Sequence, residues 1–219
     1  MKYYILSYTK GTSGESGESC KSNYSFDNAC KVCGTGAKLV GKLRTKGLLK
    51  IEKLLFETLD GDFIISQKLY EILNKKGVKL GELQSVINNK NNNLPLYHLN
   101  SNLYFPPAAE KTGLTIEGQC QTCKRNGYFN EAIIGNLKLN TPTQVFPVEL
   151  YYQKINADFL DSSDFFFTWE CTGLSNRIAH GDYVVRYARP MLIVSEFFKQ
   201  ALETEKIKGL KFEPITITI

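Results

Sequence analysis

The sequence predicts an α+β fold in which two related strand–helix–strand lobes, with mostly antiparallel sheets, are joined by a four-cysteine site. Three observations lead to this prediction. Two Cys-x-x-Cys pairs stand ninety positions apart (120 − 30), a strand–serine–helix segment follows each pair, and most other apolar segments are typical of strands. We expect one lobe over residues 1–95 and the other over residues 96–219, although both could belong to one continuous domain.

Length and composition indicate a folded globular chain. The protein has 219 residues, of which 42% are hydrophobic and 22% are charged, and its net charge is +5. These proportions are ordinary for globular proteins. Its apolar runs are shorter than the roughly 20 residues of a membrane span. The segment 1–8 is too short and too polar for a signal-peptide core, so we expect a cytoplasmic protein with reduced thiols.

The two cysteine pairs are Cys30 with Cys33 and Cys120 with Cys123. A tetrahedral Zn²⁺ ion is satisfied by four thiolates at about 2.3 Å. A two-residue gap lets each pair turn back and present both sulfurs to one ion. Gly34 supplies a permissive backbone after the first pair, whereas Lys124 follows the second. We predict that these four cysteines together bind one structural Zn²⁺.

Other interpretations of the cysteines stay open. Free buried cysteines are common small hydrophobic residues. A redox pair is less favoured, because neither pair stands at a recognisable strand-to-helix start. Iron is an alternative metal, because spacing alone does not choose between metals. Cys20 and Cys171 have no assigned role.

Two segments, residues 62–73 and 191–202, share an apolar run, a serine and an amphipathic stretch. Ser66 and Ser195 fit helix N-caps, because a hydroxyl can accept an otherwise unpaired helix N–H. Apolar residues then recur at helical spacing, namely Leu69, Ile72 and Leu73 in one segment and Phe198, Ala201 and Leu202 in the other. Identity between the segments is low, so chance similarity is an alternative, but we favour duplication.

The remaining elements are expected from turn and strand patterns. Residues 10–18 read as a flexible loop, and the asparagine-rich run 88–93 reads as a turn that divides the two lobes. Strands are expected at residues 78–83, 103–105, 144–152, 164–169, 183–187 and 210–219. The aromatic run 165–169 is too apolar for an exposed face, so we expect it to be buried.

Residues with catalytic chemistry are few. The two histidines are His98, in an apolar segment, and His180, two residues before Asp182. His180 with Asp182 fits a turn better than a base with its orienting carboxylate. Motifs of nucleotide-binding enzymes, zinc proteases and serine hydrolases are absent. Four cysteines on one zinc ion leave no position for water. We therefore predict no enzymatic activity and no catalytic residues.

The C-terminal cassette resembles a known family. Residues 192–199, Leu202 and residues 207–215 resemble the closing motif of immunity proteins from bacterial polymorphic toxin systems: a strand, Val-Ser-Glu, a helix, then Leu-x-Gly-Leu-x-Phe-x-Pro. The two cysteine pairs make the double-CxxCG branch the most similar group, which includes myxobacterial contact-dependent killing immunity proteins. Lys124 departs from the Cys-Gly pattern of that branch.

The resemblance implies a cytoplasmic protein that binds and neutralises a cognate toxin domain by occlusion, without catalytic residues and without a membrane partner. The residues that would contact the toxin are unknown. The alternative is a zinc-ribbon protein that binds nucleic acid. Its phosphate contacts would come from basic residues near the cysteine pairs, namely Lys31, Lys38, Lys42, Arg44, Lys46, Lys50, Lys124 and Arg125.

Overall fold

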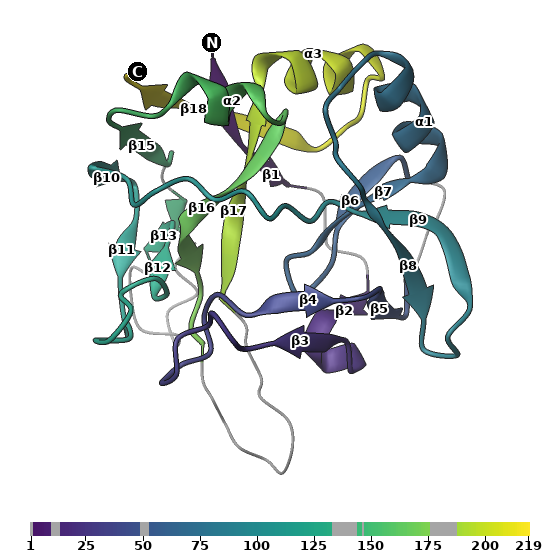
Figure 1. The fold of residues 1–219 in the computed structure, drawn as a ribbon, viewed down its shortest axis with the longest axis horizontal. Coiled ribbons are helices and arrows are strands. Elements are labelled where there is room, and N and C mark those ends of the chain that lie inside the picture. Colours follow the sequence, from purple (N-terminus) through teal and green to yellow (C-terminus); the bar gives the residue numbers. More distant parts are fainter. Residues whose placement is uncertain (1, 10–13, 49–52, 133–143, 146, 176–187) are drawn as a thin grey trace.

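A computed structural model describes residues 2–9, 14–48, 53–132, 144–145, 147–175 and 188–219. The fold mixes helices with a larger share of strands, arranged in two curled sheets (Figure 1). In the described residues the larger sheet has eight strands, in the order β10 (Glu110–Thr112), β15 (Glu149–Tyr152), β18 (Leu210–Ile217), β1 (Tyr3–Tyr8), β17 (Arg189–Ser195), β16 (Phe165–Thr172), β12 (Tyr128–Phe129) and β11 (Thr115–Ile116).

The smaller sheet has six strands in the described residues. Their order is β2 (Glu15–Ser16), β5 (Leu43–Lys46), β8 (Gln84–Asn88), β9 (Asn93–His98), β7 (Phe63–Ser66) and β6 (Leu55–Glu57). Two short ladders join β3 (Asn23–Ser25) to β4 (Lys38–Val40) and β13 (Glu131–Ala132) to β14 (Gln144–Val145). The helices of the described residues are a 3₁₀ turn, η1 (Gly17–Cys20), and three α-helices, α1 (Gln67–Lys75), α2 (Ala157–Asp161) and α3 (Glu196–Thr204).

Both sheets curl until their edges meet. In the larger sheet, edge strands β10 and β11 are separated in the chain only by Gly113 and Leu114. Gly113 has φ +70°, and a Cβ there would lie 1.8 Å from the Pro147 carbonyl oxygen, so this tight turn requires glycine. In the smaller sheet, the Leu59 N–H beyond β6 donates to the Gly14 carbonyl beside β2 at 2.9 Å.

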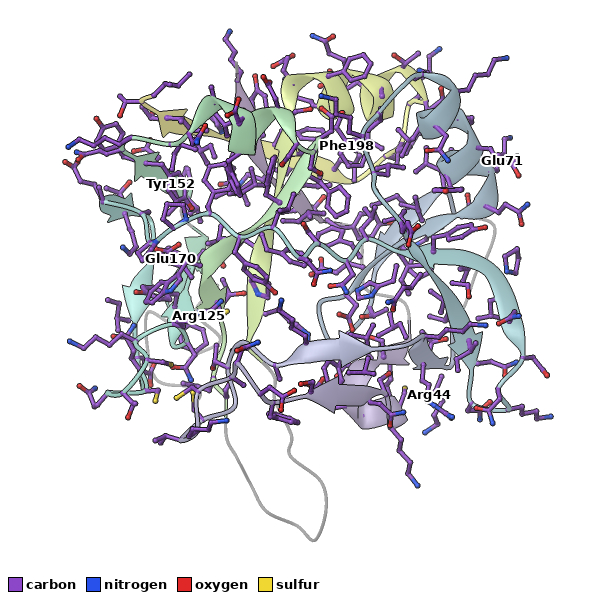
Figure 2. All side chains as sticks on the ribbon, viewed as in Figure 1. Arg44, Glu71, Arg125, Tyr152, Glu170 and Phe198 are labelled. Atoms are coloured by element: carbon purple, nitrogen blue, oxygen red, sulfur yellow. The ribbon has the colours of Figure 1, made fainter. Side chains whose placement is uncertain are left out.

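Three hydrophobic clusters follow from this curling. One fills the larger sheet, one fills the smaller sheet, and the third lies between them beneath α1 and α3. Alternation along a strand assigns neighbours to different clusters. In β1, Tyr3 and Ile5 belong to the interior of the larger sheet, whereas Leu6 belongs to the shared cluster. Phe198, labelled in Figure 2, joins α3 to the shared cluster. The two sheets are therefore packed on one common core.

The two sheets repeat one strand arrangement. The strand order β6-β7-β9-β8-β5-β2 of the smaller sheet corresponds, strand by strand, to the order β16-β17-β1-β18-β15-β10 in the larger sheet. Each strand therefore has equivalent neighbours in the two series. In each series the fourth neighbouring pair, β8 with β5 or β18 with β15, is parallel, and the other four are antiparallel. Strand β1 takes the position that β9 holds in the smaller sheet. We call β2–β9 the first unit, and β10–β18 with β1 the second unit.

Equivalent side chains perform equivalent tasks in the two units. The predicted caps are confirmed: Ser66 Oγ accepts from the Leu69 N–H at 3.2 Å, and Ser195 Oγ accepts from the Phe198 N–H at 3.1 Å. Both helices have nine residues. Four residues before each capping serine, a backbone N–H donates to a threonine hydroxyl, at 3.0 Å to Thr58 and 2.9 Å to Thr168.

Of the other strands predicted from the sequence, some are confirmed and one is wrong. The strand predicted at residues 78–83 is wrong, because Val78 and Leu80 pack under the helices in the shared core and the strand is β8 at residues 84–88. The predicted strands at 164–169 and 210–219 are confirmed as β16 and β18, and Phe165, Phe166 and Phe167 are buried. Residues 103–105 form only an isolated bridge between Tyr104 and Phe167.

Further differences concern turns and boundaries. The predicted loop at 10–18 contains β2 and the start of η1 in its described part. The predicted strand at 144–152 is two strands, β14 and β15, separated around Pro147. Residues 88–93 form the turn of the β8–β9 hairpin. The position chosen to divide the lobes, between residues 95 and 96, falls inside β9, and β1 lies in the larger sheet. The strand predicted at 183–187 lies outside the described residues.

Candidate metal centre

Each cysteine pair lies on a loop between two short paired strands. Cys30 and Cys33 stand between β3 and β4, and Cys120 and Cys123 stand between β11 and β12. These loops occupy equivalent places, because each connects the edge strand of its unit, β2 or β10, toward the next strand inward, β5 or β15. Each unit therefore contributes one two-cysteine knuckle.

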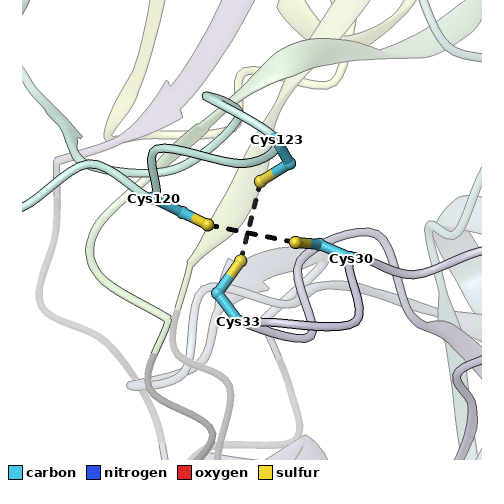
Figure 3. Close-up of side chains that lie close together, drawn as sticks. All are labelled: Cys30, Cys33, Cys120 and Cys123. Atoms are coloured by element: carbon cyan, nitrogen blue, oxygen red, sulfur yellow. Dashed lines mark hydrogen bonds between the residues drawn. The ribbon is translucent and has the colours of Figure 1, made fainter.

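The four predicted ligands converge (Figure 3). Their sulfur atoms all lie within 4.8 Å of one another. Sulfurs of equivalent cysteines are close, at 3.9 Å between Cys30 and Cys120 and 3.6 Å between Cys33 and Cys123. Four sulfurs at about 2.3 Å from a tetrahedral ion are separated by about 3.8 Å. All six cysteines of the chain are free thiols. The cluster therefore fits a four-coordinate metal ion.

The two knuckles have the same backbone turn despite different residues. The Gly34 N–H donates to the Cys30 carbonyl at 2.8 Å, and the Lys124 N–H donates to the Cys120 carbonyl at 2.9 Å. Both residues have left-handed backbones, with φ +76° at Gly34 and +54° at Lys124. Lysine adopts this region at a cost of about 1–2 kcal/mol. The second knuckle thus keeps its geometry without the glycine.

Polar and cationic groups support the sulfurs. The hydroxyl of Thr35, a buried residue, lies 3.1 Å from Cys33 Sγ and can donate to a thiolate. Arg125, labelled beside the sulfur atoms in Figure 2, donates from Nε to the Trp169 carbonyl at 3.2 Å. A Cβ on Gly36 of the first knuckle would lie 2.7 Å from Arg125 Nη1. Glycine at position 36 thus lets an arginine of the second knuckle pack against the first.

In comparisons with known proteins, neither a protein-family model nor a curated protein sequence matches this chain. The candidate site is therefore defined by its own geometry.

Some of the basic side chains proposed for phosphate binding are engaged in contacts within the protein, and others are exposed. The Arg125 guanidinium lies 5.6 Å from the Tyr104 ring centroid and 5.7 Å from that of Trp169, so it serves packing. Lys46 pairs with Glu15 at 3.7 Å, and Lys42 donates to Asn93 at 2.8 Å. Lys31, Lys38 and Lys124 are exposed, Arg44 is half-buried, and Lys50 lies outside the described residues.

Sequence reasoning missed a buried charged cluster between the units. Arg189 of β17 forms an ion pair with Glu18 at 2.5 Å, and its Nε lies 3.7 Å from Asp62 Oδ1. His98 Nε2 lies 3.4 Å from the same carboxylate oxygen, and Ser16 Oγ donates to Asp62 Oδ2 at 2.6 Å. These residues come from four separate segments, so local sequence patterns could not reveal the cluster.

Neighbouring charges shift the pKa values of the buried acidic and basic groups in this cluster. Burial alone would raise the pKa of Asp62, but the Arg189 guanidinium and the His98 ring hold it well below its usual range. Burial would likewise lower the pKa of Arg189, but Asp62 and Glu18 raise it. Glu57 next to the cluster lacks such a cation, and burial together with Asp62 raises its pKa to about 7.

The other candidate residues have structural positions. Cys171 is buried in β16, and Cys20 ends η1 with a partly exposed side chain. His180 and Asp182 lie outside the described residues. Within the part of the chain that is described, none of the helices is long and apolar enough to pass through a membrane.

Proposed function

We propose that this protein is an immunity protein that binds a cognate bacterial toxin domain and neutralises it by occlusion, on a scaffold joined by one structural zinc ion. The observation that carries the proposal is the convergence of one cysteine pair from each unit on a single four-sulfur cluster. Four thiolates leave no coordination position for water or substrate, so the cluster suits a scaffold.

The role of the scaffold follows from the repeat. Because β2–β9 and β10–β18 with β1 share one strand order, a metal ion bound between equivalent knuckles would fix the two units against each other. In this proposal the related lobes are copies of one unit, and the protein is cytoplasmic. Zinc is favoured over iron because it holds four thiolates without redox chemistry.

The family assignment rests on the C-terminal cassette. Its expected strand, Val-Ser-Glu, helix and final strand correspond to β17, α3 and β18. Ser195 of that cassette caps the helix by accepting a hydrogen bond from the Phe198 N–H. Its hydroxyl also donates a hydrogen bond to Asp164 Oδ1 at 2.5 Å. This order of strand, capped helix and strand supports the proposed family assignment.

Several exposed apolar side chains belong to the knuckle loops or to the short strands that flank them. Val32 stands between the ligands of the first knuckle and is 60% exposed, and Val40 at the end of β4 is 52% exposed. On the second knuckle, Ile116 of β11 is 62% exposed. A Cβ on Gly118 would lie 2.9 Å from Leu174, which is also exposed. Exposed apolar side chains can serve protein binding, so in this proposal the toxin contacts the knuckle loops and the strands beside them.

The test is a binding and protection experiment. If the gene directly upstream encodes a toxin domain, that domain is purified and mixed with this protein, and cells carrying the toxin are scored for survival. We expect a stable complex and rescued growth, both weakened by Val32→Asp and Ile116→Asp. Ile219→Asp, a change at an exposed position of the C-terminal end, serves as the control. A toxin that neither binds nor loses activity would contradict the proposal.

Nucleic-acid binding is the second candidate, and the exposed lysines at the knuckles are the observation in its favour. Lys31, Lys38 and Lys124 could contact phosphates. Binding of a DNA or RNA duplex that falls steeply with salt, and that Lys124→Glu weakens, would support this candidate.

A further inference from the structure

Arg125 stands at the seam where the knuckles of the two units meet. It follows Cys123 by two positions, and its backbone N–H donates a hydrogen bond to Cys123 Sγ. Thr35 holds the equivalent place in the first knuckle, two positions after Cys33, and its N–H donates to Cys33 Sγ. The two units therefore share this backbone contact, but only the second unit adds a cationic side chain to it.

Several contacts hold the Arg125 side chain in one direction. Its Nε donates to the Trp169 carbonyl at 3.2 Å, and its guanidinium carbon lies 5.6 Å and 5.7 Å from the ring centroids of Tyr104 and Trp169. Its Nη1 reaches the first knuckle, because a Cβ added to Gly36 would lie only 2.7 Å from this atom. One side chain thus links the second knuckle, β16 and the first knuckle.

Among the described residues no carboxylate balances the positive charge of Arg125. The ion pairs of this part of the chain join other groups. Arg189, the buried arginine of β17, shows the usual arrangement, since it is paired with Glu18 and Asp62. Arg125 is half-buried, so water solvates its charge only in part. A partly buried cation of this kind is stabilised by an anionic group beside it.

Four thiolates around a divalent ion are such a group. Two positive charges on the ion and four negative charges on the sulfurs leave a net charge of −2 (2 − 4). A cation fixed beside this charge stabilises the metal-loaded state relative to the metal-free state, because the attraction is stronger where water is partly excluded. Lys31 and Lys124 of the knuckles are less suited to this task, because they are exposed and solvent screens their charges.

We infer that Arg125 is a positioning residue of the metal centre, which supplies the counter-charge of the four thiolates and holds the two knuckles together. The inference rests on the proposed function for the presence of the metal, and it adds to that function the residue outside the ligands that sets metal affinity. Loss of a group behind the metal ligands typically costs about ten- to a hundredfold in metal affinity.

The experiment measures zinc affinity by competition with a chelator, together with the free energy of unfolding of each metal-free variant. Arg125→Met removes the charge and keeps a long side chain, whereas Arg125→Lys keeps the charge. We expect Arg125→Met to weaken zinc binding about tenfold or more, and Arg125→Lys to recover most of that loss. Lys124→Met removes the neighbouring exposed charge and should bind zinc as the parent does. An Arg125→Lys variant that binds zinc no better than Arg125→Met would overturn the inference.

Two glycines test the same contact without removing the charge. Gly36 and Gly41 both have left-handed backbones, with φ +92° and +76°, so alanine is strained at either position. Only the Cβ at position 36 would displace Arg125 Nη1, since nothing lies within 4 Å of a Cβ at position 41. Gly36→Ala should therefore lose zinc affinity that Gly41→Ala keeps. Equal affinities of these two variants would count against the contact and overturn the inference.

The results separate this inference from the proposed function. A parent protein that binds no zinc would refute the metal-joined scaffold and the role of Arg125 together. If the parent binds zinc and Arg125→Met binds it equally well, the scaffold stands and only the role of Arg125 is refuted.

Discussion

Lys76 and Glu205 form an ion pair at 3.2 Å, although they belong to different units. Each residue stands ten positions after the capping serine of its helix (76 − 66 and 205 − 195) and forms the C-cap of α1 or α3. Equivalent residues that contact each other mark an approximate twofold axis. The contacts between Cys30 and Cys120 and between Cys33 and Cys123 mark the same relationship at the metal end.

The first prediction concerns the metal. We expect about one zinc ion per chain, lost equally from Cys30→Ser and Cys120→Ser, because each unit supplies half of the ligands. Metal at a thousand times its Kd stabilises the fold by about 4 kcal/mol, and both variants should lose a comparable free energy of unfolding. Metal analysis and chemical denaturation give the readout. Cys20→Ser is the control, and metal retained by either ligand variant would refute a shared site.

The second prediction concerns Lys124. Its left-handed backbone carries a steric cost that glycine avoids, partly offset by the greater freedom of glycine in the unfolded chain. Lys124→Gly should therefore raise the free energy of unfolding by up to about 1 kcal/mol with unchanged metal content. Gly34→Lys should lower it by a larger amount, because Gly34 is buried and the lysine side chain would have to find space there. Denaturation of the two variants in parallel measures both effects, and a destabilised Lys124→Gly would contradict this account of the second knuckle.

The third prediction compares the two helix caps. Ser66→Ala should cost about 1 kcal/mol of stability through the lost cap. Ser195→Ala should cost more, by about another 1–2 kcal/mol, because Ser195 also donates to Asp164 and its loss leaves a partly unsatisfied buried carboxylate. Equal losses in urea denaturation would show that the Asp164 bond contributes little.

The fourth prediction concerns pH. The pKa of Glu57 is raised to about 7 by burial and by Asp62, from an ordinary value of 4.5. Between these values the folded state binds more protons than the unfolded state, so stability falls as pH rises through this window. Glu57→Gln should be more stable than the parent at pH 8, by on the order of 2 kcal/mol, and similar to it at pH 4. Denaturation at both pH values measures this difference.

The control for that experiment is Glu82→Gln, because Glu82 is exposed. It should change stability little at either pH. A Glu57→Gln variant that is less stable at pH 8 would mean that the carboxylate has a stabilising partner.

The fifth prediction tests the repeat through the order of the chain. The chain ends lie near each other (Figure 1), and β1 and β18 are antiparallel neighbours, as are β9 and β8. A circular permutant that joins residues 219 and 2 by a short glycine linker and opens between Lys90 and Asn91 should fold. In its chain order the two units exchange places. We expect cooperative unfolding and full metal content, and a permutant without metal would argue against equivalent units.

Much of this organisation is visible in the linear sequence, for local reasons. The serine before each amphipathic stretch acts within three residues of itself, and Ser66 and Ser195 cap the helices that the pattern predicts. The cysteine spacing is also local, because two residues suffice to turn each knuckle. The wrongly placed strand at residues 78–83 shows the limit. Apolar residues there serve the shared core, and burial without alternation does not distinguish a strand from a packed loop.

By itself, the sequence determined the two Cys-x-x-Cys pairs and both capped helices, since each depends on residues a few positions apart. Only the tertiary structure decided that β1 completes the second unit and that Arg189 meets Glu18 and Asp62 across the seam. It also decided that His98 faces a cavity. These contacts join segments 36 to 192 positions apart (98 − 62 and 195 − 3), and their partners are chosen by the packing of two curled sheets on one core.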